Sequence, residues 1–248
     1  MNIDNIVERV KSILIEPQTE WPIIADEPAT VADLYKNYIL ILAAIPAVCG
    51  FIKGSLIGFE VPMVGTISVG IAAGLAGMVV SYALGIVQIY VMSMIIDALA
   101  PTFGAQQNPL QALKLAAYSF TAAWIAGFGQ IIPWIGVLVA VAGGLYSIYL
   151  FYVGVPVMTK CPADQAMSYS IVSIAAAIVL SFIISHVVGT IAGGASPGHI
   201  SRSDIDYTKG SPMGTVNDRT RKLEDSIRQA EKAPNDPQAP KDDDAQDD

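Results

Sequence analysis

Long apolar stretches, separated by charged or turn-forming residues, run through the middle of the chain. A helix that crosses the apolar core of a bilayer needs roughly 20 residues, and several stretches without Asp, Glu, Lys or Arg are long enough for this. The longest apolar stretch is divided at Ile132-Pro133-Trp134, because proline favours a break between two helices. We therefore predict five transmembrane helices, over residues 37–58, 68–98, 110–131, 134–158 and 166–193.

Before the first span, apolar residues recur at the spacing of one helix face and polar residues fill the other face. The apolar residues are Ile3, Ile6, Val7, Val10, Ile13 and Leu14. Pro17 ends this amphipathic helix, and Trp21 adds an aromatic side chain of the kind found at membrane interfaces. We predict a membrane-surface or partner-binding helix over 3–15, with packing on the protein's own cytoplasmic loops as the alternative. Thr30, followed by Asp33 at capping-box spacing, predicts the start of the next helix.

The C-terminal part of the chain has a different composition. Residues 194–248 hold 12 acidic and 8 basic side chains and few large apolar ones, too few to offset the entropy of ordering. We predict an acidic, disordered tail over 194–248 with a short helix near 217–231. The expected organisation is a cytoplasmic amphipathic segment over 1–36, a five-helix transmembrane domain over 37–193, and this tail.

Composition supports the same fold class. Of 248 residues, 53% are hydrophobic and only 15% are charged, which is typical of an all-α integral membrane protein rather than a soluble domain. The net charge of −8 and the absence of a basic stripe exclude nucleic acid as a partner. The two cysteines, Cys49 and Cys161, lack the spacing of a disulfide framework or a metal site.

Basic residues flank the predicted spans unequally. One side of the membrane receives Arg9, Lys11, Lys36, Lys114 and Lys160, and the other receives Lys53, Arg202 and Lys209. Because basic residues accumulate on the cytoplasmic side, we expect the N-terminus in the cytoplasm and the C-terminus in the periplasm or exterior.

Small residues recur at every fourth position in three spans. Such faces let helix backbones approach closely in a membrane, either inside one bundle or between proteins. The expected helix-packing or partner-interface residues are Gly50, Gly54, Gly58, Gly70, Gly74, Ser173, Ala177, Ser181, Ser185, Gly189 and Gly193.

Four polar side chains within the spans are candidates for function: Asp97, Gln88, Gln130 and His186. Asp97 is read either as an ion-handling group or as a residue that ends its helix near water. His186 is read either as a hydrogen-bonding group or as a proton relay. No catalytic constellation is visible, since paired carboxylates, a nucleophile elbow and a phosphate loop are missing. We expect no enzyme activity, no metal and no cofactor.

Several ordered stretches resemble the bacterial branch of the Yip (Ypt-interacting protein) membrane family. They are Pro17-Gln-Thr-Glu-Trp21-Pro-Ile-Ile, Leu34-Tyr35, Ala43-Ala-Ile-Pro46-Ala, Ile95-Ile-Asp97-Ala-Leu-Ala-Pro101-Thr-Phe-Gly104, Gln111-Ala-Leu-Lys114-Leu-Ala-Ala-Tyr118-Ser and Pro156-Val-Met-Thr-Lys160. The resemblance covers roughly residues 8–190 and implies five transmembrane helices with a cytoplasmic N-terminus. Eukaryotic relatives are linked to Rab GTPases and to the shaping of secretory membranes. Their longer N-terminal region has no counterpart in this sequence, so we do not expect GTPase binding.

These observations predict a multi-pass protein of the bacterial inner membrane without chemistry of its own. It would act as a scaffold, an accessory subunit or a membrane organiser through helix–helix and lipid contacts. Its expected partners are membrane lipids and either another membrane protein or further copies of itself. A transporter or channel for a small solute or ion is the alternative, and it would require a continuous polar path that includes Gln88, Gln130 or Asp97.

Overall fold

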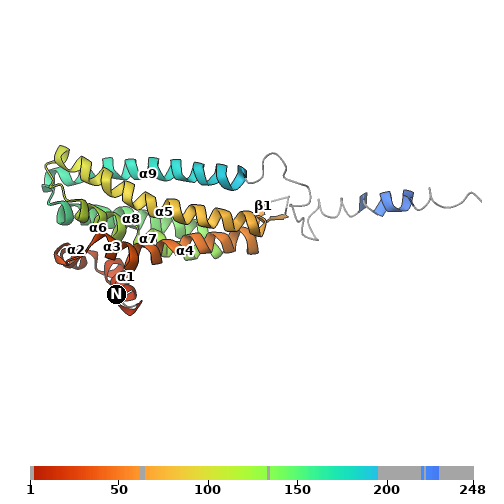
Figure 1. Ribbon diagram of the computed structural model, residues 1–248, viewed down its shortest axis with the longest axis horizontal. Coiled ribbons are helices and arrows are strands. Elements are labelled where there is room, and N and C mark those ends of the chain that lie inside the picture. The colour runs from red at the N-terminus through yellow and green to blue at the C-terminus, as the bar shows by residue number, and fades with distance from the viewer. Residues whose placement is uncertain (1–2, 62–64, 133–134, 195–218, 221, 229–248) are drawn as a thin grey trace, which may run out of the picture. The chain divides into compact units, whose positions relative to one another are not determined.

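The computed structural model describes residues 3–61, 65–132, 135–194, 219–220 and 222–228 (Figure 1). The chain divides into two units. The first holds Met1–Phe59 and Ser68–Ile205, and the second holds Glu60–Ile67 and Asp206–Asp248.

The first unit is a helical bundle in the part of the chain described. Its helical segments are α1 (Ile3–Ile15), α2 (Pro17–Asp26), α3 (Val31–Leu34), η1 (Tyr35–Ile39), α4 (Leu40–Phe51), η2 (Ile52–Ile57), α5 (Ile71–Leu99), η3 (Ala100–Phe103), α6 (Pro109–Ser119), α7 (Thr121–Ala126), η4 (Gly127–Ile131), α8 (Ile135–Thr159) and α9 (Ala163–Gly194). Figure 1 shows α4, α5, α8 and α9 running side by side, with α1 and α2 at one end of the bundle.

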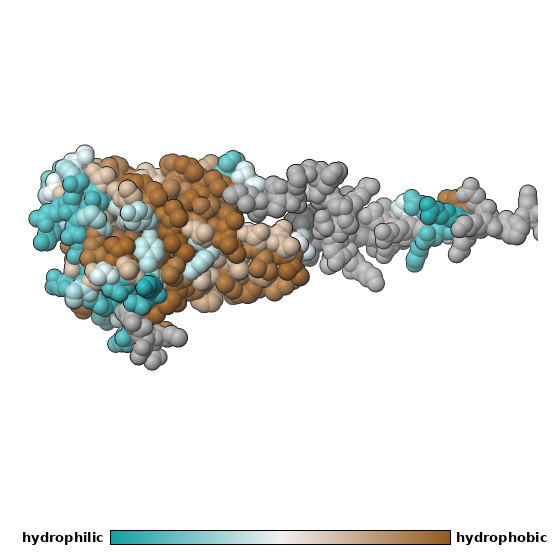
Figure 2. All heavy atoms as spheres, in the orientation of Figure 1, coloured by the Kyte–Doolittle hydropathy of each residue, from teal (hydrophilic) through white to brown (hydrophobic). Residues whose placement is uncertain are grey.

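Four helical stretches within the described residues are long and apolar enough to cross a membrane: Val31–Ile57, Ile71–Phe103, Ile135–Thr159 and Ala163–Thr190. The first joins α3, η1, α4 and η2 into one run. The span predicted over 110–131 is instead divided among α6, α7 and η4, and it carries the buried Lys114. Figure 2 shows apolar side chains over the middle of the bundle and hydrophilic ones at the end that carries α1 and α2.

Two helix starts within the described residues have side-chain caps. Thr30 precedes α3, and its hydroxyl oxygen accepts a hydrogen bond from the Asp33 backbone N–H at 3.1 Å, which confirms the predicted cap. Asn108 precedes α6, and its Oδ1 accepts hydrogen bonds from the backbone N–H groups of Leu110 and Gln111. Pro109 occupies the first turn of α6, where its missing N–H costs no helical hydrogen bond.

The segment formed by α6 and α7 lies inside the bundle. α6 packs against α5 and α8, and α7 packs against α8 and α4. The alanines of α6 and α7 allow the neighbouring backbones to approach. Gly127, directly after α7, lies so close to Pro46 that an added Cβ would be 3.0 Å from the Pro46 Cα. Residues 112–119 are buried throughout. This segment is therefore the packing centre for the longer helices around it.

The second unit holds most of a two-stranded sheet, formed by β1 (Phe59–Val61) and β2 (Gly65–Ile67). The sequence analysis predicts no strands, and this short pair is a local addition to a protein that is helical in nearly all of its described residues. The predicted disordered tail over 194–248 lies outside the described residues, apart from 194, 219–220 and 222–228. Residues 219–220 and 222–228 are helical, and Leu223 and Ile227 are exposed on them.

Candidate functional site

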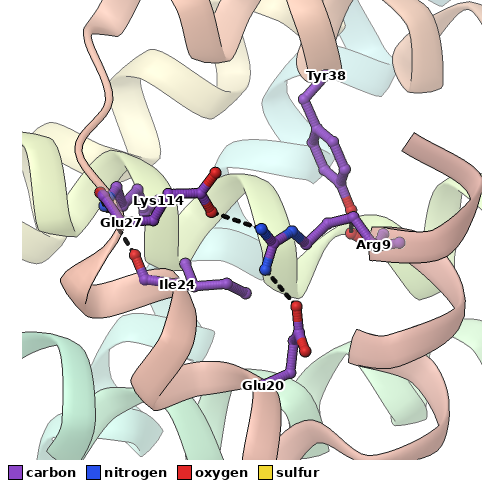
Figure 3. A network of polar contacts seen from close by, with 7 residues as sticks. Arg9, Glu20, Ile24, Glu27, Tyr38 and Lys114 are labelled. Carbon is purple, nitrogen blue, oxygen red and sulfur yellow. Dashed lines mark hydrogen bonds and ion pairs between the residues drawn. The ribbon is translucent and has the colours of Figure 1, made fainter. Parts of the chain in front are cut away.

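A network of charged side chains joins α1 to α2 at one end of the bundle (Figure 3). The Arg9 guanidinium, on α1, donates hydrogen bonds to the carboxylates of Glu20 on α2 and Glu27 just after it. The Arg9–Glu27 bond is 2.5 Å long, and only 13% of the Arg9 side chain is exposed. Because charge-assisted hydrogen bonds strengthen when water is excluded, this pairing fixes α1 on α2.

Lys114, on α6, holds the C-terminal end of α2. Its ammonium group donates hydrogen bonds to the backbone carbonyl oxygens of Ile24, at 2.7 Å, and of Glu27, at 2.6 Å. The neighbouring Gln111 amide donates to the Ala25 carbonyl at 3.0 Å. The last carbonyls of a helix have no partner in the helix itself and carry partial negative charge, so a cation is favourable there. Lys114 thus caps α2 from a distant helix, although only 2% of the residue is exposed.

Aromatic side chains pack beneath these charges. Tyr38 and Tyr118 have ring centroids 4.5 Å apart, and the Tyr38 hydroxyl is hydrogen-bonded to Thr121 at 2.7 Å. Trp21 meets Tyr118 edge to face, with ring centroids 6.4 Å apart, and lies against Gly154 of α8. The contacts of Trp21 seat α2 against the core of the bundle.

The predicted membrane-surface helix, α1, uses much of its apolar face inside the protein. Ile6 and Ile13 are buried, Trp21 is buried on α2, and Val10 and Leu14 are partly buried against the same core. The Leu14 carbonyl accepts a hydrogen bond from the Tyr146 hydroxyl of α8 at 2.6 Å. Val7 is exposed, and the side chain of Ile3 lies outside the described residues. This arrangement corresponds to the alternative interpretation, packing on the protein itself.

The small-residue face of α9 divides into two parts. Ser173 is buried, Ala177 packs partly buried against the core, and Ser181 is hydrogen-bonded to Gln88 of α5. Ser185 and Gly189 are exposed, and a Cβ added at Gly189 would meet nothing within 4 Å. A four-residue repeat drifts by about 40° per step on a helix with 3.6 residues per turn, so the face rotates away from α5 along α9. The side-chain position of Gly193 lies outside the described residues.

The predicted glycine positions of the other helices differ in how closely neighbouring atoms approach them. A Cβ at Gly74 would collide with Ser55 and Phe51, and Gly54 is buried, so these positions bring α5 close to η2 and α4. Gly70 has open space around it, and Gly50 faces the Gln130 side chain, 3.6 Å from an added Cβ. Gly58 ends η2 with a φ of 82°, a conformation that glycine adopts readily.

The polar candidates within the spans lie apart. The Gln88 amide donates to the Ser181 hydroxyl at 2.6 Å, and Gln88, Ser81 and Ser181 line a cavity of about 300 Å³ among α4, α5, α7 and α9. The other lining residues are Ala43, Pro46, Ala47, Gly85, Ile89, Phe120, Ala123 and Trp124, so this cavity touches neither Gln130 nor Asp97. Asp97 has one buried carboxylate oxygen without a hydrogen-bond partner in the described part of the chain, and His186 is exposed.

Cys161 lies in the connection between α8 and α9 and is buried. Burial raises the pKa of the Cys161 thiol, and the nearby Asp164 carboxylate acts in the same direction. The Cys161 sulfur lies 3.5 Å from the carbonyl oxygens of Phe103 and Pro162, which share its single S–H hydrogen. A thiol in this state is a poor nucleophile. Among the described residues, no three His, Cys, Asp or Glu side chains lie together in a way that could hold a metal ion.

Sequence reasoning missed the network of Arg9, Glu20, Glu27 and Lys114 as a unit. It counted Arg9 and Lys114 only as charges flanking the membrane. One signal was available: Lys114 stands in Ala-Leu-Lys-Leu-Ala-Ala, with apolar residues on both sides. A lysine in such an apolar run needs buried partners.

The comparisons with known proteins agree on one family. The model of the Yip1 domain family matches residues 11–185. The protein called inner membrane protein YohC, from Escherichia coli strain K12 and from Escherichia coli O6:H1, is 24% identical over 176 residues, which cover 70% of this chain and 90% of the relative. No solved structure matches the chain.

Proposed function

The chain belongs to the Yip1 domain family of membrane proteins, and from that premise we propose that it is a non-enzymatic scaffold or accessory subunit. It organises other membrane proteins, or copies of itself, through helix–helix and lipid contacts. Its relative YohC is called an inner membrane protein, and we assign this chain to the bacterial inner membrane on that basis. GTPase binding forms no part of this proposal.

The observation that carries the proposal is the exposure of the C-terminal half of α9, which includes Ser185 and Gly189. Only 6% of the apolar stretch of α9, within Ala163–Thr190, is buried inside the protein, compared with 33% for the span Val31–Ile57. The small-residue face, which meets α5 through Ser181, continues into the exposed Ser185 and Gly189. Since small residues gain little from contact with lipid and much from close contact with another helix, this half of α9 is suited to a partner helix.

The proposal includes five crossings with the N-terminus in the cytoplasm. Helical hydrogen bonding continues through the junction of α6 and α7, where Phe120 N–H donates to the Ala116 carbonyl and Trp124 N–H donates to the Phe120 carbonyl. This supports one continuous crossing by α6, α7 and η4 beside α4 and α8. An odd number of crossings places the tail on the periplasmic or exterior side, in agreement with the five basic residues that flank the spans on the side of the N-terminus against three on the other side.

The experiment is gentle extraction of the full-length protein from its native membrane, followed by native mass determination. We expect a stoichiometric partner or a homo-oligomer. Ser185→Leu combined with Gly189→Leu should remove that association without changing membrane insertion, because leucine at these positions faces lipid in the isolated chain. Ile183→Leu combined with Val187→Leu, on another side of α9, is the matched control. A lone, lipid-bound monomer would contradict the proposal.

A passage for a small solute is the second candidate, and the cavity lined by Gln88, Ser81 and Ser181 favours it. A conduit needs polar groups along its wall inside the bundle, and the Gln88 amide and the two serine hydroxyls supply them. Flux of solutes or protons into vesicles that contain the protein tests this candidate. Gln88→Leu should lower the flux if it exists, and equal flux with and without protein would remove the candidate.

A further inference from the structure

A second cavity, of about 280 Å³, lies at the end of the bundle that carries α1 and α2. It opens where the chain enters the first candidate span, since Asp33, Leu34 and Asn37 belong to Val31–Ile57. Glu27, Lys114 and Tyr118 also line it, and Ile24, Pro28, Ala29 and Tyr38 complete its wall. At the first turns of a spanning helix, such a cavity lies at the depth of lipid headgroups.

Several polar groups of this cavity have unused hydrogen-bonding capacity. Tyr118 is only 6% exposed, and in the part of the chain described its hydroxyl has no hydrogen-bond partner. The Asn37 amide likewise has none among the described residues. Lys114 uses two of its three N–H groups on the carbonyls of Ile24 and Glu27. The Tyr118 hydroxyl is open to the cavity although its ring is buried, so it is available to hydrogen-bond to whatever occupies the cavity.

The charges of the cavity define what fits. Lys114 supplies one positive charge in its wall, where Asn37 and Tyr118 add neutral hydrogen-bond donors. Glu27 and Asp33 each keep one carboxylate oxygen free of the hydrogen bonds that their other oxygens accept from Arg9 and Thr30. The donors suit a phosphate, and the two carboxylates suit an ammonium group. A ligand that carries both charges a short distance apart satisfies the two sets together.

We propose that this cavity binds the headgroup of an aminophospholipid. Its phosphate lies toward Lys114, Asn37 and Tyr118, and its primary ammonium lies toward Glu27 and Asp33. The acyl chains remain in the bilayer beside the first span. The volume admits a headgroup and is small for a whole drug-sized molecule, for which sites begin at about 300 Å³. The headgroup would bridge the N-terminal helices, the first span and α6.

The test is lipid retention by the full-length protein. The protein is placed in nanodiscs of phosphatidylethanolamine, phosphatidylcholine and phosphatidylglycerol in equal parts, then released and weighed by native mass spectrometry. We expect one retained phosphatidylethanolamine per chain, and retention of the other two lipids reduced about tenfold, because neither offers N–H donors to the carboxylates. Equal retention of the three lipids, or preference for another one, would overturn the proposal. An excess of free phosphoethanolamine distinguishes a soluble ligand, which would displace the lipid, from a membrane-anchored one.

Two variants assign the retention to this cavity. Tyr118→Phe removes only the unpartnered hydroxyl, and Asp33→Asn removes a charge while keeping an oxygen for Thr30; each should lower retention severalfold. The matched controls are Tyr149→Phe and Asp164→Asn, which change exposed residues outside the cavity. Full retention in both cavity variants would refute the assignment. Retention in the Ser185→Leu, Gly189→Leu variant should be normal, so that this inference and the proposed association through α9 fail independently.

Discussion

The ammonium group of Lys114 lies 2.7 Å from the carbonyl oxygen of Ile24, a residue 90 positions earlier in the chain. A second carbonyl, of Glu27, lies 2.6 Å from the same nitrogen. One side chain of α6 therefore satisfies two carbonyls at the end of α2. The N-terminal helices are joined to the packing centre of the bundle at this point.

Lys114→Met keeps most of the side-chain volume and removes both hydrogen bonds. Each buried carbonyl left without a partner costs about 1–3 kcal/mol, so we expect the free energy of unfolding to fall by about 2 kcal/mol or more. The thermal midpoint in detergent measures this, and limited proteolysis should show faster cleavage near α2. Lys36→Met, which changes an exposed lysine, is the control. A midpoint equal to that of the control would show that the capping contributes little.

Arg9→Gln tests the other anchor of α2. The change leaves the Glu20 carboxylate, with only 11% of its side chain exposed, without its cationic partner. We expect a loss of about 2 kcal/mol, since unpaired charge in a partly buried site is unfavourable. Adding Glu20→Gln should recover part of this loss, because the isolated charge is then gone. The four proteins form a double-mutant cycle, and additive effects within about 0.5 kcal/mol would argue against coupling. Lys11→Gln, an exposed change on α1, is the control.

The length of the apolar stretches without charge was sufficient to predict the long helices. Apolar runs uninterrupted by charge coincide with α5, α8 and α9, because a helix surrounded by lipid needs apolar residues on every side. The amphipathic pattern of α1 was equally visible. The surface that this apolar face contacts could not be predicted, since such a face is suited equally to a membrane surface and to the protein's own core.

The network around Arg9 depends on contacts that the sequence does not display. Arg9 and Glu27 are 18 positions apart, and Lys114 and Glu27 are 87 apart, so no local pattern joins them. The division of the α9 face depends on the drift of a four-residue repeat relative to a neighbour whose position the sequence leaves open. The cavity lined by Lys114 and Tyr118 could not be predicted from the sequence either, because its wall comes from α2, α3, η1 and α6 together.

Cys161 should react slowly with alkylating reagents, in a Cys49→Ala background. Only the thiolate reacts, and the raised pKa of the Cys161 thiol lowers the thiolate fraction near neutral pH. The reaction rate should therefore keep rising above about pH 8.5, where a free thiol is already half ionised. Asp164→Asn should shift the pH–rate curve toward lower pH, since one nearby negative charge is removed. A curve that coincides with that of a free thiol would contradict the burial of this residue.

Gly154 and Gly144 offer a matched pair on α8. A Cβ at Gly154 would lie 2.6 Å from the Trp21 ring and 2.7 Å from the Leu115 side chain, whereas a Cβ at Gly144 would meet nothing within 4 Å. Trp21 and Leu115 are fully buried and have little room to move, so Gly154→Ala should destabilise the protein by about 1–3 kcal/mol. Gly144→Ala should leave stability unchanged or raise it slightly, because alanine favours a helix more than glycine does. Thermal midpoints of the two variants in one detergent make the comparison. If Gly154→Ala were as stable as Gly144→Ala, Trp21 could not be seated against α8, and the docking of α2 in the bundle would have to be revised.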